Sequence, residues 1–352
     1  MNKKKDYYKK VLSVKNNEII LICEISGNHN NSFYHLKRLI NEAIKQKVDL
    51  IKFQVYKPET LTLNTELKDF KITNLKNWSK HKNLFNLFKK SHTPWNWIKR
   101  LTKILDKKKI NWFASVFDKS SVDFMEELNC KAYKIASPEI TDINLIEYVA
   151  SKNKPILLST GMADINDLNL AVKYIKKHHS KFAILKCTSK YPASYNDLNL
   201  SAIKKIKRIY KCAVGFSDHT IDDLAGNLSV LYGSTIIEKH FKLDGDHSSI
   251  DSHFSTPISK YQKIKKKLNN VLKCVGNENI GFKIDKEQIN SRRSIYVCKD
   301  IRKNSKLNID NVKSVRPGFG LHPKFLKKIL GKSVKKNLRY GSPLNLKDIN
   351  FK

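Results

Sequence analysis

The stretch KCAVGFSDHTIDDLAGNLSVLYGSTIIEKHF, residues 211–241, contains the pattern that decides the fold. Two short apolar runs, 212–217 and 235–241, are typical of strands, and the segment between them is long enough for a helix. Each run is followed or ended by a histidine, His219 in the first case and His240 in the second. A strand–helix–strand unit predicts parallel strands, whose C-terminal ends meet at one edge of the sheet.

Runs of the same kind recur along the chain and alternate with amphipathic segments such as 32–47 and 164–179. The runs occupy residues 19–25, 49–55, 110–116, 131–137, 155–160, 182–188, 212–217 and 235–241. They are nearly continuous apolar segments, as expected of parallel strands that are buried on both faces. Eight strand–helix repeats predict an α/β fold, the TIM (β/α)8 barrel.

The pattern changes after the last expected helix of the barrel. The segment 276–288 is polar and punctuated by glycine, and it is followed by short strand-like pieces and turns. We therefore expect a TIM-barrel catalytic domain at 1–275, a linker at 276–288 and a small C-terminal domain at 289–352.

One connection within the barrel is unusually long. Residues 56–93 separate the second expected strand from its helix, and they include Trp78, Phe85 and Phe88. A connection of this length is more often a functional insertion or lid than an idle linker.

The formal net charge is +36, from 68 Lys and Arg against 32 Asp and Glu. Such an excess is compatible with nucleic-acid or membrane binding. The lysines are spread along the whole chain, however, and no RNP, KH or helix-turn-helix signature accompanies them, so we expect no specific nucleic-acid partner.

No apolar run could span a bilayer, and no signal-type apolar core follows the basic N-terminus, so we expect no membrane association. Six cysteines without CxxC spacing favour a reduced, cytoplasmic protein.

Polar side chains gather at the expected C-terminal ends of the strands, where TIM barrels carry their active sites. In chain order they are Glu24, Lys52, Gln54, Ser115, Lys134, Ser137, Glu139, Ser159, Ser189, Tyr191, Ser217, His219, Glu238 and His240. Interior lysines need an anionic partner, which is either a core glutamate or a bound anion. With a ring of hydroxyls they predict a pocket for phosphate and carboxylate. Two imidazoles beside a carboxylate suit a divalent metal with open positions, which could polarise a carbonyl oxygen.

Longer motifs surround these strand ends. They are EISGNHN (24–30), IKFQVYKPETLTL (51–63), TPWNW (93–97), YKIASPEITD (133–142), LLSTGMAD (157–164), LKCTSKYPA (185–193), GFSDHT (215–220), IEKHF (237–241) and RPGFGLHP (316–323). In this order they resemble the sialic acid synthase family, and most closely its pseudaminic branch. The resemblance implies a TIM barrel followed by an antifreeze-like (SAF) domain. It also implies a transferase of the EC 2.5.1 type that condenses phosphoenolpyruvate with an N-acetylated amino sugar, releases phosphate and uses a divalent metal, Mn²⁺ or Mg²⁺.

The resemblance also implies roles for individual residues. The metal ligands would be His219 and His240. The phosphoenolpyruvate pocket would comprise Lys52, Ser115, Lys134, Ser137, Ser159, Ser189 and Ser217. The sugar-binding residues would be Gln54, Glu139, Tyr191 and Arg316, and the catalytic carboxylates Glu24, Glu238 and Asp251. Arg316 would reach into the barrel of a second subunit, which implies a domain-swapped homodimer.

Three positions depart from the family pattern. Ser248 and Ser249 stand where relatives tend to have glycine, and Val116 stands where proline is usual. If the loop needs positive φ at the two serines, it would be strained there, so we expect altered loop geometry.

The prediction of the acceptor sugar depends on the motif SGNHN (26–30), which favours the pseudaminic branch. The expected acceptor is therefore 2,4-diacetamido-2,4,6-trideoxy-L-altrose. N-acetylmannosamine, giving N-acetylneuraminate, and the diacetamido-trideoxymannose that leads to legionaminate are the alternatives. A non-catalytic protein that binds carbohydrate or nucleic acid is an alternative of another class. An inactive relative would be expected to lose a histidine or lysine from the strand ends, and none is missing here.

Overall fold

The computed structural model divides the chain into two compact units, Met1–Gly276 and Asn277–Lys352. It describes residues 6–72, 78–79, 81–277, 279–281 and 283–351. The first unit is the predicted TIM barrel, so the fold class is confirmed. No helix in this described part of the chain is long and apolar enough to cross a membrane.

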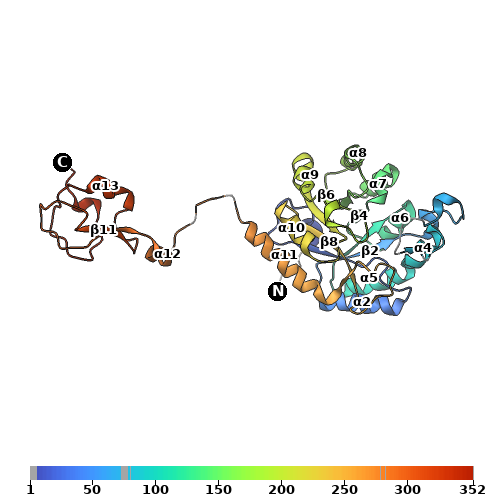
Figure 1. Cartoon of the computed structure of the whole chain (residues 1–352). Helices are drawn as coiled ribbons and strands as arrows, with labels where there is room; N and C mark the ends of the chain where they lie inside the picture. The colour runs from blue at the N-terminus through green and yellow to red at the C-terminus, as the bar shows by residue number, and fades with distance from the viewer. Residues whose placement is uncertain (1–5, 73–77, 80, 278, 282, 352) are drawn as a thin grey trace. The chain divides into compact units, whose positions relative to one another are not determined.

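Eight parallel strands form the barrel, and the pairing of β1 with β8 closes it. Helices surround these strands (Figure 1). The strands are β1 (Ile20–Glu24), β2 (Leu50–Val55), β3 (Trp112–Val116), β4 (Tyr133–Ile135), β5 (Ile156–Ser159), β6 (Phe182–Cys187), β7 (Ala213–Asp218) and β8 (Ile236–Lys242). A two-residue strand, β9 (Thr256–Pro257), adds to the end of β8. Every residue of β1, β7 and β8 is buried, as expected for strands covered on both faces.

Helices cover the outside of the barrel. They are α2 (Phe33–Lys45), α5 (Trp95–Lys107), α6 (Lys119–Glu127), α7 (Ile143–Ser151), α8 (Ile165–Lys176), α9 (Ala202–Tyr210), α10 (Leu224–Leu231) and α11 (Tyr261–Val275), with the short α1 (Tyr7–Lys10) near the N-terminus. In α2 the buried residues Leu36, Leu39, Ile40 and Ala43 follow helical spacing, and the Ser32 side chain accepts a hydrogen bond from the backbone N–H of His35. The apolar stripe therefore determines which face of the helix packs on the strands.

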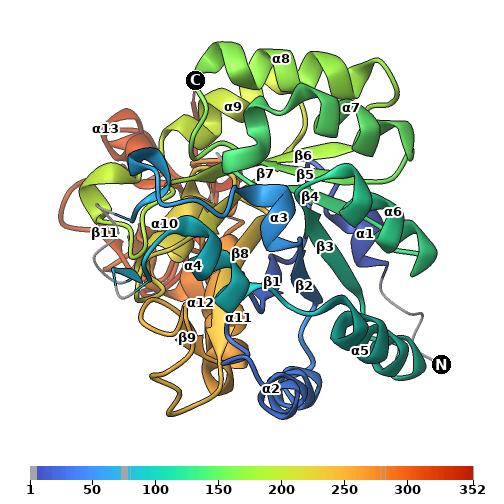
Figure 2. The ribbon, with the colours of Figure 1, turned by 90° about the vertical axis from the view of Figure 1, so that its right-hand side faces the viewer.

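The described part of the long connection after β2 includes α3 (Pro58–Leu61), a 3-10 turn (Lys68–Phe70) and α4 (Leu84–Ser91), before α5 begins. In Figure 2 both helices lie in front of the strands. The buried Asn83 starts α4, because its side chain accepts a hydrogen bond from the backbone N–H of Asn86 at 2.9 Å. Residues 73–77 and 80 of this connection lie outside the described residues.

The second unit has its own apolar core of ten buried residues, which include Ile295, Val312 and Leu344. Its regular elements are the antiparallel pair β10 (Ser294–Val297) and β11 (Val312–Val315), and the short helices α12 (Lys286–Ser291) and α13 (Leu326–Ile329). A side chain at Gly320 would clash with the backbone, since its Cβ would lie 2.5 Å from the carbonyl oxygen of Ile295. The segment expected to be a linker, 276–288, includes the first turn of α12.

Candidate active site

A cavity of about 320 Å³ opens at the C-terminal ends of the barrel strands. Most of the expected site residues line it, namely Lys52, Gln54, Ser115, Lys134, Ser137, Ser159, Ser189, Tyr191, Ser217, His219, Glu238, His240 and Asp251. Glu24 is fully buried and contacts the cavity-lining Lys52. Glu139 lies in the short 3-10 turn Pro138–Thr141 after β4. Arg316 belongs to the second unit, where it is exposed directly after β11.

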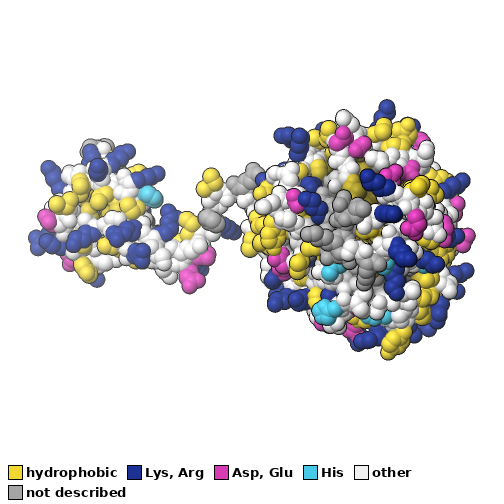
Figure 3. Space-filling model, turned by 45° about the vertical axis from the view of Figure 1, so that its right-hand side comes forward, with side chains coloured by type: hydrophobic (Ala, Val, Ile, Leu, Met, Phe, Trp, Pro, Cys, Tyr) yellow, Lys and Arg dark blue, Asp and Glu magenta, His cyan; other side chains and the backbone are white. Residues whose placement is uncertain are grey.

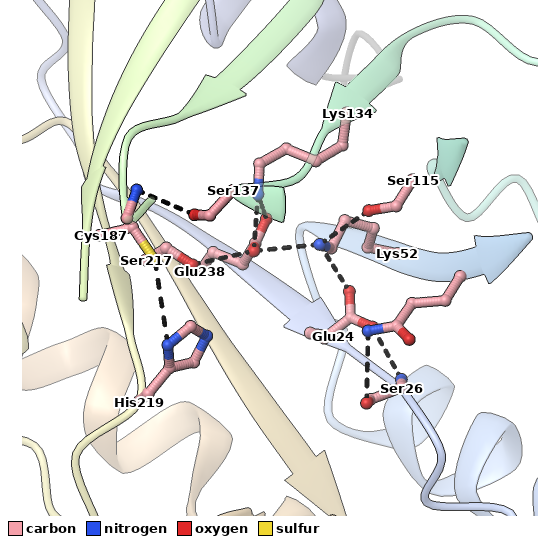
Figure 4. A network of polar contacts seen from close by, with 12 residues as sticks. Glu24, Ser26, Lys52, Ser115, Lys134, Ser137, Cys187, Ser217, His219 and Glu238 are labelled. Atoms are coloured by element: carbon pink, nitrogen blue, oxygen red, sulfur yellow. Dashed lines mark hydrogen bonds and ion pairs between the residues drawn. The ribbon is translucent and has the colours of Figure 1, made fainter. Parts of the chain in front are cut away.

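Glu238 stands at the centre of a buried network of charges (Figure 4). Its Oε1 accepts hydrogen bonds from Lys134 Nζ at 2.9 Å, Lys52 Nζ at 3.0 Å and Ser217 Oγ at 3.0 Å. Lys52 also lies 3.0 Å from Glu24 Oε2. Two lysines and two glutamates therefore balance each other when all four are ionised. The sequence left open whether the interior lysines pair with core glutamates or with a bound anion. In the structure, core glutamates are their partners.

The protonation of this network depends on the balance between burial and neighbouring charges. Burial raises the pKa of Glu24 to about 7, the charge of Glu238 adds to this, and Lys52 opposes it. Burial would also raise the pKa of Glu238, but Lys134 and Lys52 together hold it well below its usual range. Burial lowers the pKa of Lys134. Protonation of Glu24 near neutral pH would leave the cluster with a net positive charge.

Hydroxyl groups line the part of the cavity next to β5 and β6, and the backbone of Gly161 contacts one of them. The backbone N–H of Gly161 donates to Ser137 Oγ at 3.0 Å, and Ser159 Oγ is buried with no hydrogen-bond partner among the described residues. A side chain at Gly161 would fill this space, since its Cβ would lie 2.3 Å from Ser189 Oγ and 2.8 Å from Ser137 Oγ. The arrangement keeps donors free around a space that suits a small anion.

The two histidines lie next to each other, with ring centroids 5.3 Å apart. His219 Nδ1 lies 2.9 Å from the carbonyl oxygen of Thr188, so Nδ1–H donates to it. Burial opposes the charged form, but the nearby Cys187 raises the pKa of His219, so Nε2 offers its lone pair to a metal only after it loses its proton. His240 Nδ1 is buried with no hydrogen-bond partner among the described residues. Burial, with the charge of His219 adding to it, lowers the pKa of His240, so its ring stays neutral, which is the form that binds a metal.

These two rings provide free nitrogen atoms, which fits a divalent metal. In the part of the chain that the structure describes, however, no group of three or more His, Cys, Asp or Glu is arranged to hold one. A metal here would therefore need oxygen ligands from water or substrate, which agrees with the open positions expected from the sequence.

Asp251 lies on the β1 side of the cavity. Its carboxylate accepts hydrogen bonds from Ser26 Oγ and from the backbone N–H of Gly27, and burial raises its pKa. Gln54 Nε2 donates to the same Ser26 hydroxyl at 3.4 Å. Ser248 and Ser249 do not adopt positive φ, so the strain considered for that loop is not present.

Glu139 and Tyr191, both expected to face the sugar, sit in different surroundings. Glu139 Oε2 is buried without a hydrogen-bond partner among the described residues, and burial raises the pKa of this carboxyl to about 7. Tyr191 packs on His219, with ring centroids 4.4 Å apart.

Two sets of cavity residues were missed from the sequence. Cys187 was not among the expected site residues, yet it lines the cavity, with Sγ 3.9 Å from His219 Nδ1. The motif LKCTSKYPA contained the signal, because Cys187 alternates with Ser189 along one face of the chain. The second set, Tyr56, Leu61, Leu84 and Leu87, comes from the long connection after β2. Of the aromatic residues singled out there, Trp78 and Phe88 line the cavity and Phe85 does not.

Comparison with known proteins indicates the same family as the motifs do. The NeuB family model matches residues 39–280, and the SAF domain model matches residues 292–350. Pseudaminic acid synthase from Campylobacter jejuni is 36% identical over 94% of this chain and 96% of its own length, and the Helicobacter pylori enzyme of that name is 35% identical over 94% and 97%. The crystal structure of an N-acetylneuraminic acid synthetase from Leptospira borgpetersenii superposes with a TM-score of 0.68, at 29% identity, over 77% of this chain and 90% of that one.

Proposed function

The chain belongs to the NeuB family, and we propose that it acts as a pseudaminic acid synthase, a transferase that joins phosphoenolpyruvate to 2,4-diacetamido-2,4,6-trideoxy-L-altrose. The observation that carries the proposal is the cavity at the strand ends. It combines two buried lysines, a ring of serines and two adjacent histidines in a chain 36% identical to such a synthase over most of its length.

The reaction is proposed to run as follows. C3 of phosphoenolpyruvate attacks the aldehyde carbon of the open-chain sugar, which forms the new C–C bond, while the C=O π bond breaks and the aldehyde oxygen takes up a proton to become a hydroxyl group. Water adds to the cationic C2 and loses a proton, and phosphate leaves when the C2–O bond breaks. Lys52 and Lys134 stabilise the negative charges of phosphoenolpyruvate, and the serine hydroxyls hold its phosphate. Glu24 or Asp251 orients the water or accepts its proton.

His219 and His240 are proposed to hold a divalent metal, Mn²⁺ or Mg²⁺, which when bound would polarise the aldehyde oxygen. Glu238 lies in the same cavity, but it accepts hydrogen bonds from both Lys52 and Lys134. Its proposed role is therefore to position these two lysines. The remaining sugar groups are proposed to contact Gln54, Glu139 and Tyr191.

Arg316 is proposed to complete the site of a second subunit, so that the active form is a domain-swapped homodimer. The support is its exposed position at the end of β11, where a planar guanidinium can donate to an acetamido carbonyl. The division into a barrel at 1–275, a linker at 276–288 and a SAF domain at 289–352 belongs to this proposal. We further propose a cytoplasmic location, since all six cysteines are unpaired and four of them are buried.

A panel of acceptors tests the function. The purified protein with Mn²⁺ and phosphoenolpyruvate should release phosphate with the altrose derivative and form a product of the corresponding mass. N-acetylmannosamine and the diacetamido-trideoxymannose test the neuraminate and legionaminate alternatives. Lys134→Ala should lose turnover, whereas the matched change at the exposed Lys131, just before β4, should not. Absence of phosphate release with every acceptor would favour a non-catalytic binding protein.

A further inference from the structure

One side of the cavity is apolar, although a sugar is expected to bind there. We call this side the apolar wall, and it consists of Tyr56, Leu61, Leu84, Leu87, Phe88 and Phe117. All six are buried or partly buried. Except for Phe117, which follows β3, they come from the connection after β2.

The polar atoms of this wall are already paired within it. Tyr56 is 3% exposed, and its hydroxyl donates to Ser91 Oγ at 2.7 Å. Ser91 in turn donates to the carbonyl oxygen of Leu87 at 3.1 Å. The rings of Phe88 and Phe117 pack edge-on against Tyr56, at 6.0 and 5.2 Å. A substrate hydroxyl that met this surface would lose its hydrogen bonds to water and gain none.

The place of the wall in the barrel determines which end of the acceptor it meets. His219 and His240 follow β7 and end β8, and the order of the closed barrel places β3 opposite β7. The aldehyde carbon must lie near the histidines and above the Lys52 and Lys134 side chains to react. An acceptor whose carbon chain extends across the cavity, away from β7, would bring its far end to the β2–β3 side.

We propose that the apolar wall selects acceptors whose last carbon is a methyl group, that is, 6-deoxy amino sugars, over those with a 6-hydroxyl group. This inference rests on the proposed function and names the residues that read the far end of its acceptor. The hydroxyls of the sugar bind at the polar lining of the cavity next to this wall, at Ser26, Gln54 and Asp251. An apolar surface discriminates against an added hydroxyl by about 100-fold at most, so the expected preference for the 6-deoxy acceptor is about 10- to 100-fold in kcat/KM.

The test compares a 2,4-diacetamido-2,4,6-trideoxyhexose with its 6-hydroxy counterpart, using the full chain with Mn²⁺. Leu84→Asn places an amide in the wall at the first residue of α4, where a polar residue is tolerated, and Leu61→Asn does so at the last residue of α3. Either variant should lower the preference for the 6-deoxy acceptor at least 5-fold. The control is Leu63→Asn, at a leucine of the same connection that is 64% exposed and lies outside the cavity. It should keep the wild-type ratio.

The outcomes separate the inference from the proposed function. Equal kcat/KM for both acceptors in the wild type would overturn the role of the wall while leaving the synthase function intact. The same conclusion would follow if Leu84→Asn and Leu61→Asn, folded and active, kept the wild-type ratio. Absence of turnover of both acceptors by the wild type would contradict the proposed function and the inference with it.

Discussion

Lys239→Met would break a buried ion pair that lies directly behind the two histidines. Lys239 Nζ lies 3.0 Å from Asp218 Oδ2 and donates to the carbonyl oxygen of Thr220 at 2.7 Å, and both charged side chains are 1% exposed. Asp218 precedes His219 and Lys239 precedes His240, and the two form a register pair between β7 and β8. We therefore expect the ion pair to help position the two residues that are proposed to hold the metal.

The size of the stability loss follows from the burial of the Lys239–Asp218 pair. Removing one member of a buried pair leaves an uncompensated charge on Asp218, which costs about 3–5 kcal/mol of unfolding free energy. Asp218 Oδ1 would still accept from the backbone N–H and hydroxyl of Thr220, at 2.9 and 2.7 Å. The double variant Lys239→Met/Asp218→Asn is neutral and keeps that acceptor, so it should recover most of the lost stability. Misplaced histidines should still weaken metal binding by about 10- to 100-fold, which is the usual effect of losing residues that orient metal ligands.

Urea unfolding and calorimetric titration with Mn²⁺ measure the two effects separately. As a control, Lys177→Met removes an exposed pair with Glu147, in which the two side chains are 46% and 41% exposed, and should change neither quantity appreciably. If the double variant regains stability and binds Mn²⁺ as tightly as the wild type, the ion pair does not position the histidines.

Four further expectations concern other parts of the molecule. His240→Ala should abolish turnover with the fold intact by circular dichroism, and a chelator should silence the wild type until Mn²⁺ is restored; full activity in metal-free buffer would contradict this. The pKa of Glu24, raised to about 7, predicts that the cluster is positive below this pH and neutral above it. The Kd of phosphoenolpyruvate should therefore rise from pH 6 to pH 8 more in the wild type than in Glu24→Gln, and parallel curves would disprove the coupling. Arg316→Ala mixed with His240→Ala under subunit exchange should regain part of the activity, because one heterodimer site then has both groups intact; heterodimers without activity would place the arginine in its own chain. Duplex DNA should bind weakly and lose affinity steeply with salt, and a tight complex with one sequence at physiological salt would refute this.

The weak binding expected for DNA follows from where the charge lies. Figure 3 shows Lys and Arg side chains scattered over the visible face of each unit, with no single basic patch. Scattered cations attract polyanions without recognising them, and salt screens that attraction.

The barrel could be predicted from the sequence because its signal is local. Each strand is a short apolar run followed by an amphipathic segment, and His219 and His240 stand at fixed places within these runs. The contacts among site residues could not be predicted, since they join distant positions. Lys52 and Glu238 are 186 residues apart, and only the closure of the barrel brings them to 3.0 Å. Leu84 and Phe88 have helical spacing, which would suit a core helix equally well.

The closure of the barrel also explains why two lysines can be kept inside it without substrate. Glu238 on β8 accepts from Lys52 on β2 and Lys134 on β4, so one carboxylate holds two ammonium groups side by side. An anion arriving above them competes with Glu238 for the same protons. The free-energy cost of drawing the lysines away from Glu238 is smaller when Glu24, which is 3.0 Å from Lys52, takes up a proton. Substrate binding and proton uptake are thereby linked through Lys52, and the burial that raises the pKa of Glu24 brings this linkage into the neutral range.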